Sequence, residues 1–161
     1  MPQKRNNRKD AISLLKEDHK VMQDLLQRLV DASSRPSKSR DNILSKVHDE
    51  LKTHEQVEQE IFYPAFKEAV QKKDDRQLFF EAREEHHVVD VVLEEINNLH
   101  DGEDSFSAKC RLLQELVSHH IKEEEKGMFP VARKSIEPKT LQEMGRQMEE
   151  RKLAIRSELA S

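Results

Sequence analysis

Histidine and glutamate recur in this chain at one spacing, in two segments far apart in the sequence. The first segment contains His54 and Glu58, and the second contains His120 and Glu124. In both segments a proline stands ten residues after the histidine. An i, i+4 pair on a helix places both side chains on one face, about 6 Å apart, so that they can share one ion. The repeated pair therefore predicts metal binding between helices.

Each pair is preceded along the chain by a lone histidine that directly follows an acidic residue. These companions are Asp18-His19 before His54 and Glu85-His86 before His120. The chain is thus a duplicated unit of about 66 residues, long enough for one helical hairpin each. We expect the two hairpins to pack about a pseudo-twofold axis.

The composition indicates long helices. Of 161 residues, 37% are charged and 35% hydrophobic, with three glycines and five prolines. So few helix breakers, together with short connections, predict an all-α, up-down-up-down antiparallel four-helix bundle with an additional C-terminal helix. We divide the chain into a flexible basic tail, the bundle, and a C-terminal amphipathic helix packed on it, at residues 1–9, 10–133 and 134–161.

The helices are expected at residues 8–32, 40–71, 76–100, 106–133 and 139–159. Pro64 and Pro130 should kink or interrupt the second and fourth helices, because proline lacks the backbone N–H that the helix needs. Ser105 is a plausible N-cap of the fourth helix. In the fifth, the spacing of Leu141, Met144, Met148 and Ile155 favours packing against the bundle over binding a partner protein.

Within each helix the apolar residues recur at intervals of three and four, which defines one inward-facing line. Six polar residues occupy positions on these lines that core side chains otherwise hold: His19, His54, Glu58, His86, His120 and Glu124. The line passes through His86 and leaves His87 about 100° away. His119 and Glu123 form a weaker second option in the fourth helix. His48 and His100 have no counterpart in the other half and are expected at the surface.

A metal ion is the most economical explanation for these six residues. A single histidine on an apolar face is more often a hydrogen-bonded core residue, and a buried carboxylate without a partner is costly. Six such groups in register are instead satisfied by a cation. Imidazole with carboxylate, and without thiolate, suits iron, manganese or zinc.

Two further residues have less specific interpretations. Tyr63 follows Glu58 by five residues and turns away from the site in a regular helix, although a kink before Pro64 would bring it close as a hydrogen-bond donor. Cys110 is expected in the core. As a single cysteine it cannot form an internal disulfide, which fits a reducing, cytoplasmic location.

The charge pattern argues against two classes of partner. The formal net charge is −4 and both signs are mixed along the chain, which does not favour a nucleic-acid surface. Apolar runs stay far below the roughly 18 residues that span a bilayer, and the start lacks the apolar stretch of a signal peptide. We therefore expect neither nucleic acid nor a membrane as a partner.

The motifs Asp18-His19, His54-x-x-x-Glu58, Glu85-His86 and His120-x-x-x-Glu124, with the prolines that follow, resemble the hemerythrin-like, or HHE cation-binding, family. The resemblance covers about residues 11 to 131. It implies two non-haem irons in an oxo- or hydroxo-bridged centre, for which zinc or manganese can substitute. The resemblance makes the four histidines terminal ligands and the two glutamates bridging carboxylates.

One departure from the oxygen-carrying members bears on function. Those members have two histidines four residues apart on the third helix, whereas Ala82 and Asp90 flank His86 at that spacing here. Fewer protein ligands would leave more open positions on one iron. We expect a protein that binds O₂, NO or peroxide in oxidative or nitrosative stress or iron homeostasis. The alternatives are an enzyme decomposing hydrogen peroxide or nitric oxide, or, by family analogy alone, an iron–sulfur repair factor. The sequence assigns no catalytic residue outside the ligands.

Overall fold

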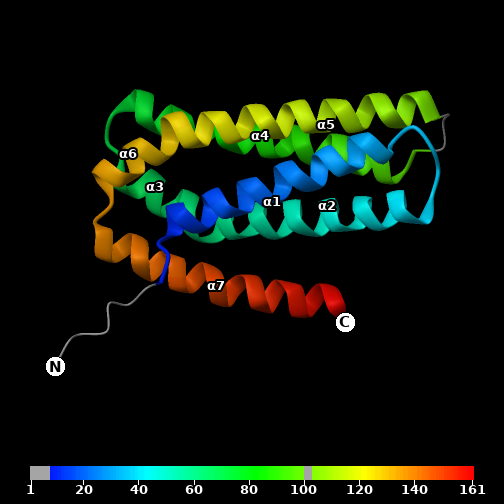
Figure 1. The fold of residues 1–161 in the computed structure, drawn as a ribbon. Coiled ribbons are helices and arrows are strands. Elements are labelled where there is room, and N and C mark those ends of the chain that lie inside the picture. The colour runs from blue at the N-terminus through cyan, green and yellow to red at the C-terminus, as the bar shows by residue number, and fades with distance from the viewer. Residues whose placement is uncertain (1–7, 100–102) are drawn as a thin grey trace.

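The computed structural model describes residues 8–99 and 103–161. Four long helical rods form two antiparallel hairpins, and a further helix lies along one side of them (Figure 1). The expected all-α bundle with an additional C-terminal helix is confirmed. Most of the tail predicted at residues 1–9 lies outside the described residues, as does His100. No helix in the described ranges has the length and apolar character needed to cross a membrane.

The first hairpin is formed by α1 (Ala11–Ala32) and α2 (Lys38–Val57). Both helices begin at a side-chain cap. The Asp10 carboxylate accepts a hydrogen bond from the backbone N–H of Ser13, and the Ser37 hydroxyl accepts one from the backbone N–H of Arg40. Such caps satisfy donors that the first helical turn leaves free.

The second hairpin is formed by α4 (Lys73–Asn97) and α5 (Glu103–Glu123). Both helices begin earlier than the sequence predicts, so Ser105 lies inside α5 and is not its N-cap. Acidic residues occupy the first turn of α4, at Asp74 and Asp75, where they interact favourably with the helix dipole. This stabilisation extends the helix toward its N-terminus.

Two wide turns interrupt the second and fourth rods at equivalent places. The π-helical turns η1 (Glu58–Phe62) and η2 (Glu124–Met128) lead into the short helices α3 (Tyr63–Ala69) and α6 (Phe129–Ser135). The backbone N–H of Tyr63 bonds to the carbonyl of Glu58, five residues back, and Phe129 does the same with Glu124. The disturbance predicted at the two prolines is therefore a wider turn, which accommodates a ring that would clash with a regular helix.

The buried apolar residues form two clusters, one on each side of a polar layer. Along α1, His19 lies between Leu15 of one cluster and Met22 of the other. Along α4, His86 lies in the same way between Ala82 and Val89. The polar layer is thus enclosed at both ends by apolar packing that excludes water.

The last helix, α7 (Pro138–Ala160), packs on the first hairpin. Its inward face buries Leu141, Met144, Met148 and Ile155. Gly145 permits a close approach, because a Cβ atom there would lie 2.5 Å from the carbonyl oxygen of Lys9. Helix α7 is therefore held against the start of α1, near enough to contribute to the polar layer.

Candidate metal centre

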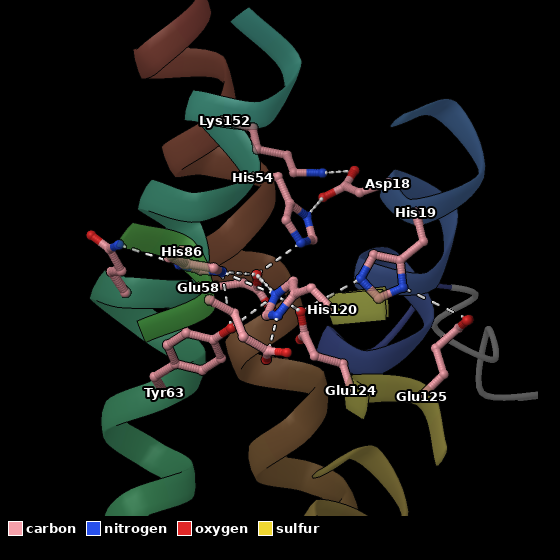
Figure 2. A network of polar contacts seen from close by, with 12 residues as sticks. Asp18, His19, His54, Glu58, Tyr63, His86, His120, Glu124, Glu125 and Lys152 are labelled. Carbon is pink, nitrogen blue, oxygen red and sulfur yellow. Dashed lines mark hydrogen bonds and ion pairs between the residues drawn. The ribbon is translucent and has the colours of Figure 1, made fainter. Parts of the chain in front are cut away.

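The six residues that share the duplicated spacing meet in the polar layer, where all are buried (Figure 2). Their nitrogen and oxygen atoms fall into two groups, within each of which the atoms lie within 4.8 Å of one another. One group consists of Glu58, His86, His120 and Glu124, and the other of His19, His54 and Glu124. These are two adjacent candidate positions for a metal ion, and they share Glu124.

Many atoms of this layer form no hydrogen bond of regular geometry within the described chain, although some face one another as close nitrogen–oxygen pairs. They are both ring nitrogens of His19, Nε2 of His54, and all four carboxylate oxygens of Glu58 and Glu124. Leaving buried polar groups unsatisfied costs about 1–3 kcal/mol each, so proteins rarely do so without a reason. A cation would take up these lone pairs, so the residues fit a metal ion.

An outer carboxylate orients one histidine of each hairpin. Nδ1 of His54 lies 2.9 Å from Asp18, and Nδ1 of His120 lies 3.1 Å from Glu85. Once a ring has lost its second proton, with Nδ1–H donating to the carboxylate, Nε2 presents its lone pair to the layer. In the structure Nε2 of His54 lies 2.8 Å from Glu58.

Sequence reasoning did not assign a role to Asp18 or Glu85. The available signal was their repeated position, since each directly precedes the lone histidine of its hairpin. On a helix, that residue lies about 100° from the histidine and can reach the neighbouring rod. The two acids therefore form a second duplicated feature of the site.

The buried carboxylates also set the protonation of the imidazoles. Burial disfavours the charged ring of His54, but Glu58 and Asp18 outweigh it and raise the pKa of His54 to about 10. Burial also lowers the pKa of His120, but Glu124 and further acids outweigh it and raise this pKa well above its usual value. Without metal these rings hold protons, and a metal ion must displace them to bind.

Tyr63 is directed into the site from η1–α3 and is 1% exposed. Its hydroxyl lies 3.1 Å from Nε2 of His86 and 3.4 Å from Nε2 of His120. Of the two orientations that the sequence left open, the structure has the one toward the site, because the wide turn rotates residue 63 inward. Burial, with the charge of Glu124, raises the pKa of Tyr63 well above its ordinary value, so the phenol stays protonated.

The equivalent residue in the second hairpin is Phe129, which also follows its glutamate by five residues. Its ring stacks on His19, with centroids 5.7 Å apart and planes 7° from parallel. The two metal positions therefore differ, because a hydroxyl group faces the one with His86 and an apolar ring covers the one with His19.

The last helix contributes one buried ammonium group. Lys152 of α7 donates to the Asp18 carboxylate, which in turn holds His54 (Figure 2). Among the described residues, Glu85 has no buried lysine or arginine beside it, and besides His120 it lies 3.3 Å from the exposed His119. The two outer carboxylates thus have different surroundings, and nothing in the spacing of the motifs indicated the contact with Lys152.

Several histidines and acids lie outside the layer. His87, His119 and Glu123 are exposed, in contrast to their neighbours His86, His120 and Glu124. His48 is part-buried, with its ring 3.3 Å from Asp49. Cys110 is buried in the cluster that surrounds Met22 and Leu26.

Comparison with known proteins identifies relatives of this arrangement. The family model described as Hemerythrin HHE cation binding domain matches residues 10–132. No protein with a curated description matches the chain significantly. Among solved structures, a Hemerythrin HHE cation binding domain-containing protein from Mycobacterium kansasii is similar, with 25% identity and a TM-score of 0.77. The match covers 93% of this chain and 89% of that one, and so includes at least part of α7.

Proposed function

This chain belongs to the hemerythrin HHE cation-binding domain family, and from that premise we propose that it holds two iron ions and binds a small oxidant ligand. The ligand would be O₂, NO or peroxide, in oxidative or nitrosative stress or in iron homeostasis. The observation that carries the proposal is the set of buried imidazole nitrogens and carboxylate oxygens that two hairpins bring together in two groups.

The proposed ligands divide between two positions. His19 and His54 would hold one ion, and His86 and His120 the other. Glu58 and Glu124 would bridge them, since Oε1 of Glu58 lies 2.8 Å from His54 and 3.3 Å from His86. When bound, a pair of iron ions supplies redox chemistry and open coordination positions for a small ligand.

The donor atoms suit iron, and membership of the hemerythrin family favours iron over other metals. The site offers imidazole and carboxylate groups and no thiolate, since Cys110 lies in an apolar cluster. Such donors also suit manganese and zinc. Two bridging carboxylates between adjacent positions favour a bimetallic centre over a single structural zinc, which typically has four ligands closed around it.

An enzyme that decomposes hydrogen peroxide or nitric oxide is the second candidate, and Tyr63 favours it. Its hydroxyl lies beside the His86 position and stays protonated, so it can donate a hydrogen bond to a ligand bound there. A hydrogen-bond donor placed where charge develops is a common way to assist a reaction. Stable adduct formation through repeated cycles of reduction and air exposure would support binding, whereas rapid peroxide turnover would support the enzyme.

The ligand set predicts different outcomes for two neighbouring histidines. His86→Ala should lower the metal content of protein purified from iron-supplied cells, from about two irons per chain, because it removes a nitrogen facing the layer. His87→Ala is the matched control and should keep the wild-type content, since its ring is exposed. Elemental analysis measures both. One zinc and no iron in the wild type, or equal loss in both variants, would contradict the proposal.

A further inference from the structure

The fourth rod carries a second histidine–glutamate pair that the candidate metal centre does not use. His119 and Glu123 on α5 have the same spacing as the buried pair that lies one residue further along, but both are exposed. On a helix, an offset of one residue turns the pair about 100° away from the polar layer. The pair therefore faces outward beside the centre, on the flank where α5 packs against α4.

A hollow of about 350 Å³ lies between α4 and α5 at this pair. Besides His119 and Glu123, its lining includes three acids of α4, namely Glu81, Glu84 and Glu85. Among the described residues, no lysine or arginine lines it. The charge of the hollow is therefore negative, and its field attracts cations.

Glu85 connects the exposed pair to the buried centre. Its Oε2 lies 3.3 Å from Nε2 of the exposed His119, and its Oε1 lies 3.1 Å from Nδ1 of the buried His120. The carboxylate and Nε2 of His119 are close enough to bind one ion together. Glu123 lies one helical turn from His119, about 6 Å away, and can supply a further oxygen.

A narrow passage continues inward from this hollow. It has room for about 10 Å³, and it shares Glu81, Glu85 and Glu123 with the wider hollow. The lining of the passage also includes Glu124, whose side chain is 1% exposed. Both carboxylate oxygens of Glu124 lack a hydrogen bond of regular geometry within the described chain. The passage thus leads to a buried acid that belongs to both candidate metal positions.

The cavity on the other side of α4 offers a cation a less favourable approach. It has a volume of about 580 Å³ and reaches His86, but its lining includes the cations Lys67 and Arg83. Among the described residues its one acid is Asp90, which lies 2.7 Å from the ammonium group of Lys52. Charge repulsion therefore disfavours this side for a metal ion, and the acidic flank is the favoured route.

We infer that His119, Glu123 and Glu85 bind a divalent metal ion at the surface, and that the ion passes between α4 and α5 to Glu124 to load the centre. The inference rests on the proposed function in one respect, namely that the buried layer is the destination of the ion. The exposed side chains offer few donors and hold the ion weakly. One buried group offers four residues, so transfer inward is favourable.

The width of the passage predicts which ions it admits. A volume of about 10 Å³ holds about one water molecule, so a fully hydrated ion does not fit. An entering ion must exchange bound water for the carboxylate oxygens along the passage. Magnesium gives up its water reluctantly, so Mg²⁺ should compete poorly with Co²⁺ or Mn²⁺ for entry.

Stopped-flow absorption of Co²⁺ entering the metal-free protein tests the route. In the wild type the loading rate should saturate as the Co²⁺ concentration rises, because binding at the surface precedes transfer. His119→Ala combined with Glu123→Gln should load about tenfold more slowly at low Co²⁺ concentration, and its rate should depend less on ionic strength. The Co²⁺ content at equilibrium should equal that of the wild type, because neither residue belongs to the candidate centre.

The matched control is His87→Ala combined with Glu115→Gln. It removes the same two kinds of side chain from exposed positions that line neither the hollow nor the passage, and it should load as the wild type does. A second readout is electron paramagnetic resonance of Mn²⁺ added to protein already loaded with Co²⁺. The wild type should bind further Mn²⁺ weakly, and the variant that lacks His119 and Glu123 should not.

An unchanged loading rate in the variant lacking His119 and Glu123 would overturn the inference, as would equal slowing in the control. Loss of Co²⁺ at equilibrium in that variant, or Mn²⁺ binding that survives the two substitutions, would also overturn it. Binding of Mn²⁺ at the surface does not require iron or an oxidant ligand. These results are therefore separable from a failure of the proposed function, which metal analysis of the purified protein detects.

Discussion

Asp18 and Glu85 occupy equivalent positions but differ in exposure. The Asp18 side chain is 7% exposed and the Glu85 side chain 23%. Asp18 is held between two buried groups, His54 and Lys152, whereas Glu85 faces His120 and solvent. Each carboxylate therefore holds one histidine, but Asp18 does so in a buried environment and Glu85 in a partly hydrated one.

This difference predicts unequal effects of neutralising the two acids. Asp18→Asn should weaken metal binding by about 10- to 100-fold, the usual range for residues that orient metal ligands. Glu85→Gln should have a smaller effect, because water can replace part of the interaction. Competition with a chelator measures both affinities. A larger loss in Glu85→Gln would show that exposure does not govern the contribution of these acids.

At the same scale, helical spacing in the sequence singled out the six histidines and glutamates that meet in the polar layer. It gave no role to the side chains that contact them. Helical spacing selects residues that face inward from one rod, and so it distinguishes His86 from His87. It contains no information on which side chain of another rod lies opposite. Asp18 and Lys152 lie 134 positions apart, and only the packing of α7 brings them together.

Among the elements, the two π turns have the largest effect on the site. A regular helix advances about 100° per residue, so residue 63 would lie about 140° from Glu58. The wide turn adds a residue and brings Tyr63 to the same side as Glu58. Proline at this position indicated an irregularity, but a kink and a π turn both accommodate proline, so the sequence left the direction of Tyr63 open.

Helix α7 supplies Lys152, although the family model ends at residue 132. Lys152→Met keeps the length of the side chain and removes the ammonium from the Asp18 carboxylate. We expect metal affinity to fall by about tenfold, because Asp18 would hold His54 less firmly. Arg151→Met is the matched control on the same helix, since Arg151 pairs with the exposed Glu60. Chelator competition distinguishes them, and wild-type affinity in Lys152→Met would exclude this role for α7.

For the molecule as a whole, metal binding and stability without metal should respond oppositely to pH. The raised pKa of His54, about 10, means that its contribution to metal-free stability is complete below about 6.5. That contribution is lost as the pH rises toward 10. Metal binding instead strengthens over the same interval, because the metal takes the deprotonated ring.

On the acid side, burial opposes the charge of Asp18, but His54 and Lys152 outweigh it and lower its pKa below 3.8. Its contribution is therefore present above that value and is lost as the pH falls through the lowered pKa. Thermal unfolding of metal-free protein and chelator titrations across this range measure both trends. Metal affinity that decreased between pH 6.5 and 10 would contradict the assignment of protons to the histidines.

The relation between the two hairpins has a consequence for how such a centre arises. Each hairpin supplies one lone histidine and one histidine–glutamate pair, and the glutamates act across both halves. Two separate copies of one hairpin, paired about a twofold axis, would assemble the same six groups. In such a homodimer, the twofold symmetry would make the two metal positions identical. Joining the copies in one chain removes this constraint, and the two halves differ at Tyr63 and Phe129 and in the contact with Lys152. If two ions bind as proposed, this asymmetry would allow one to serve structure and the other to remain open for reaction.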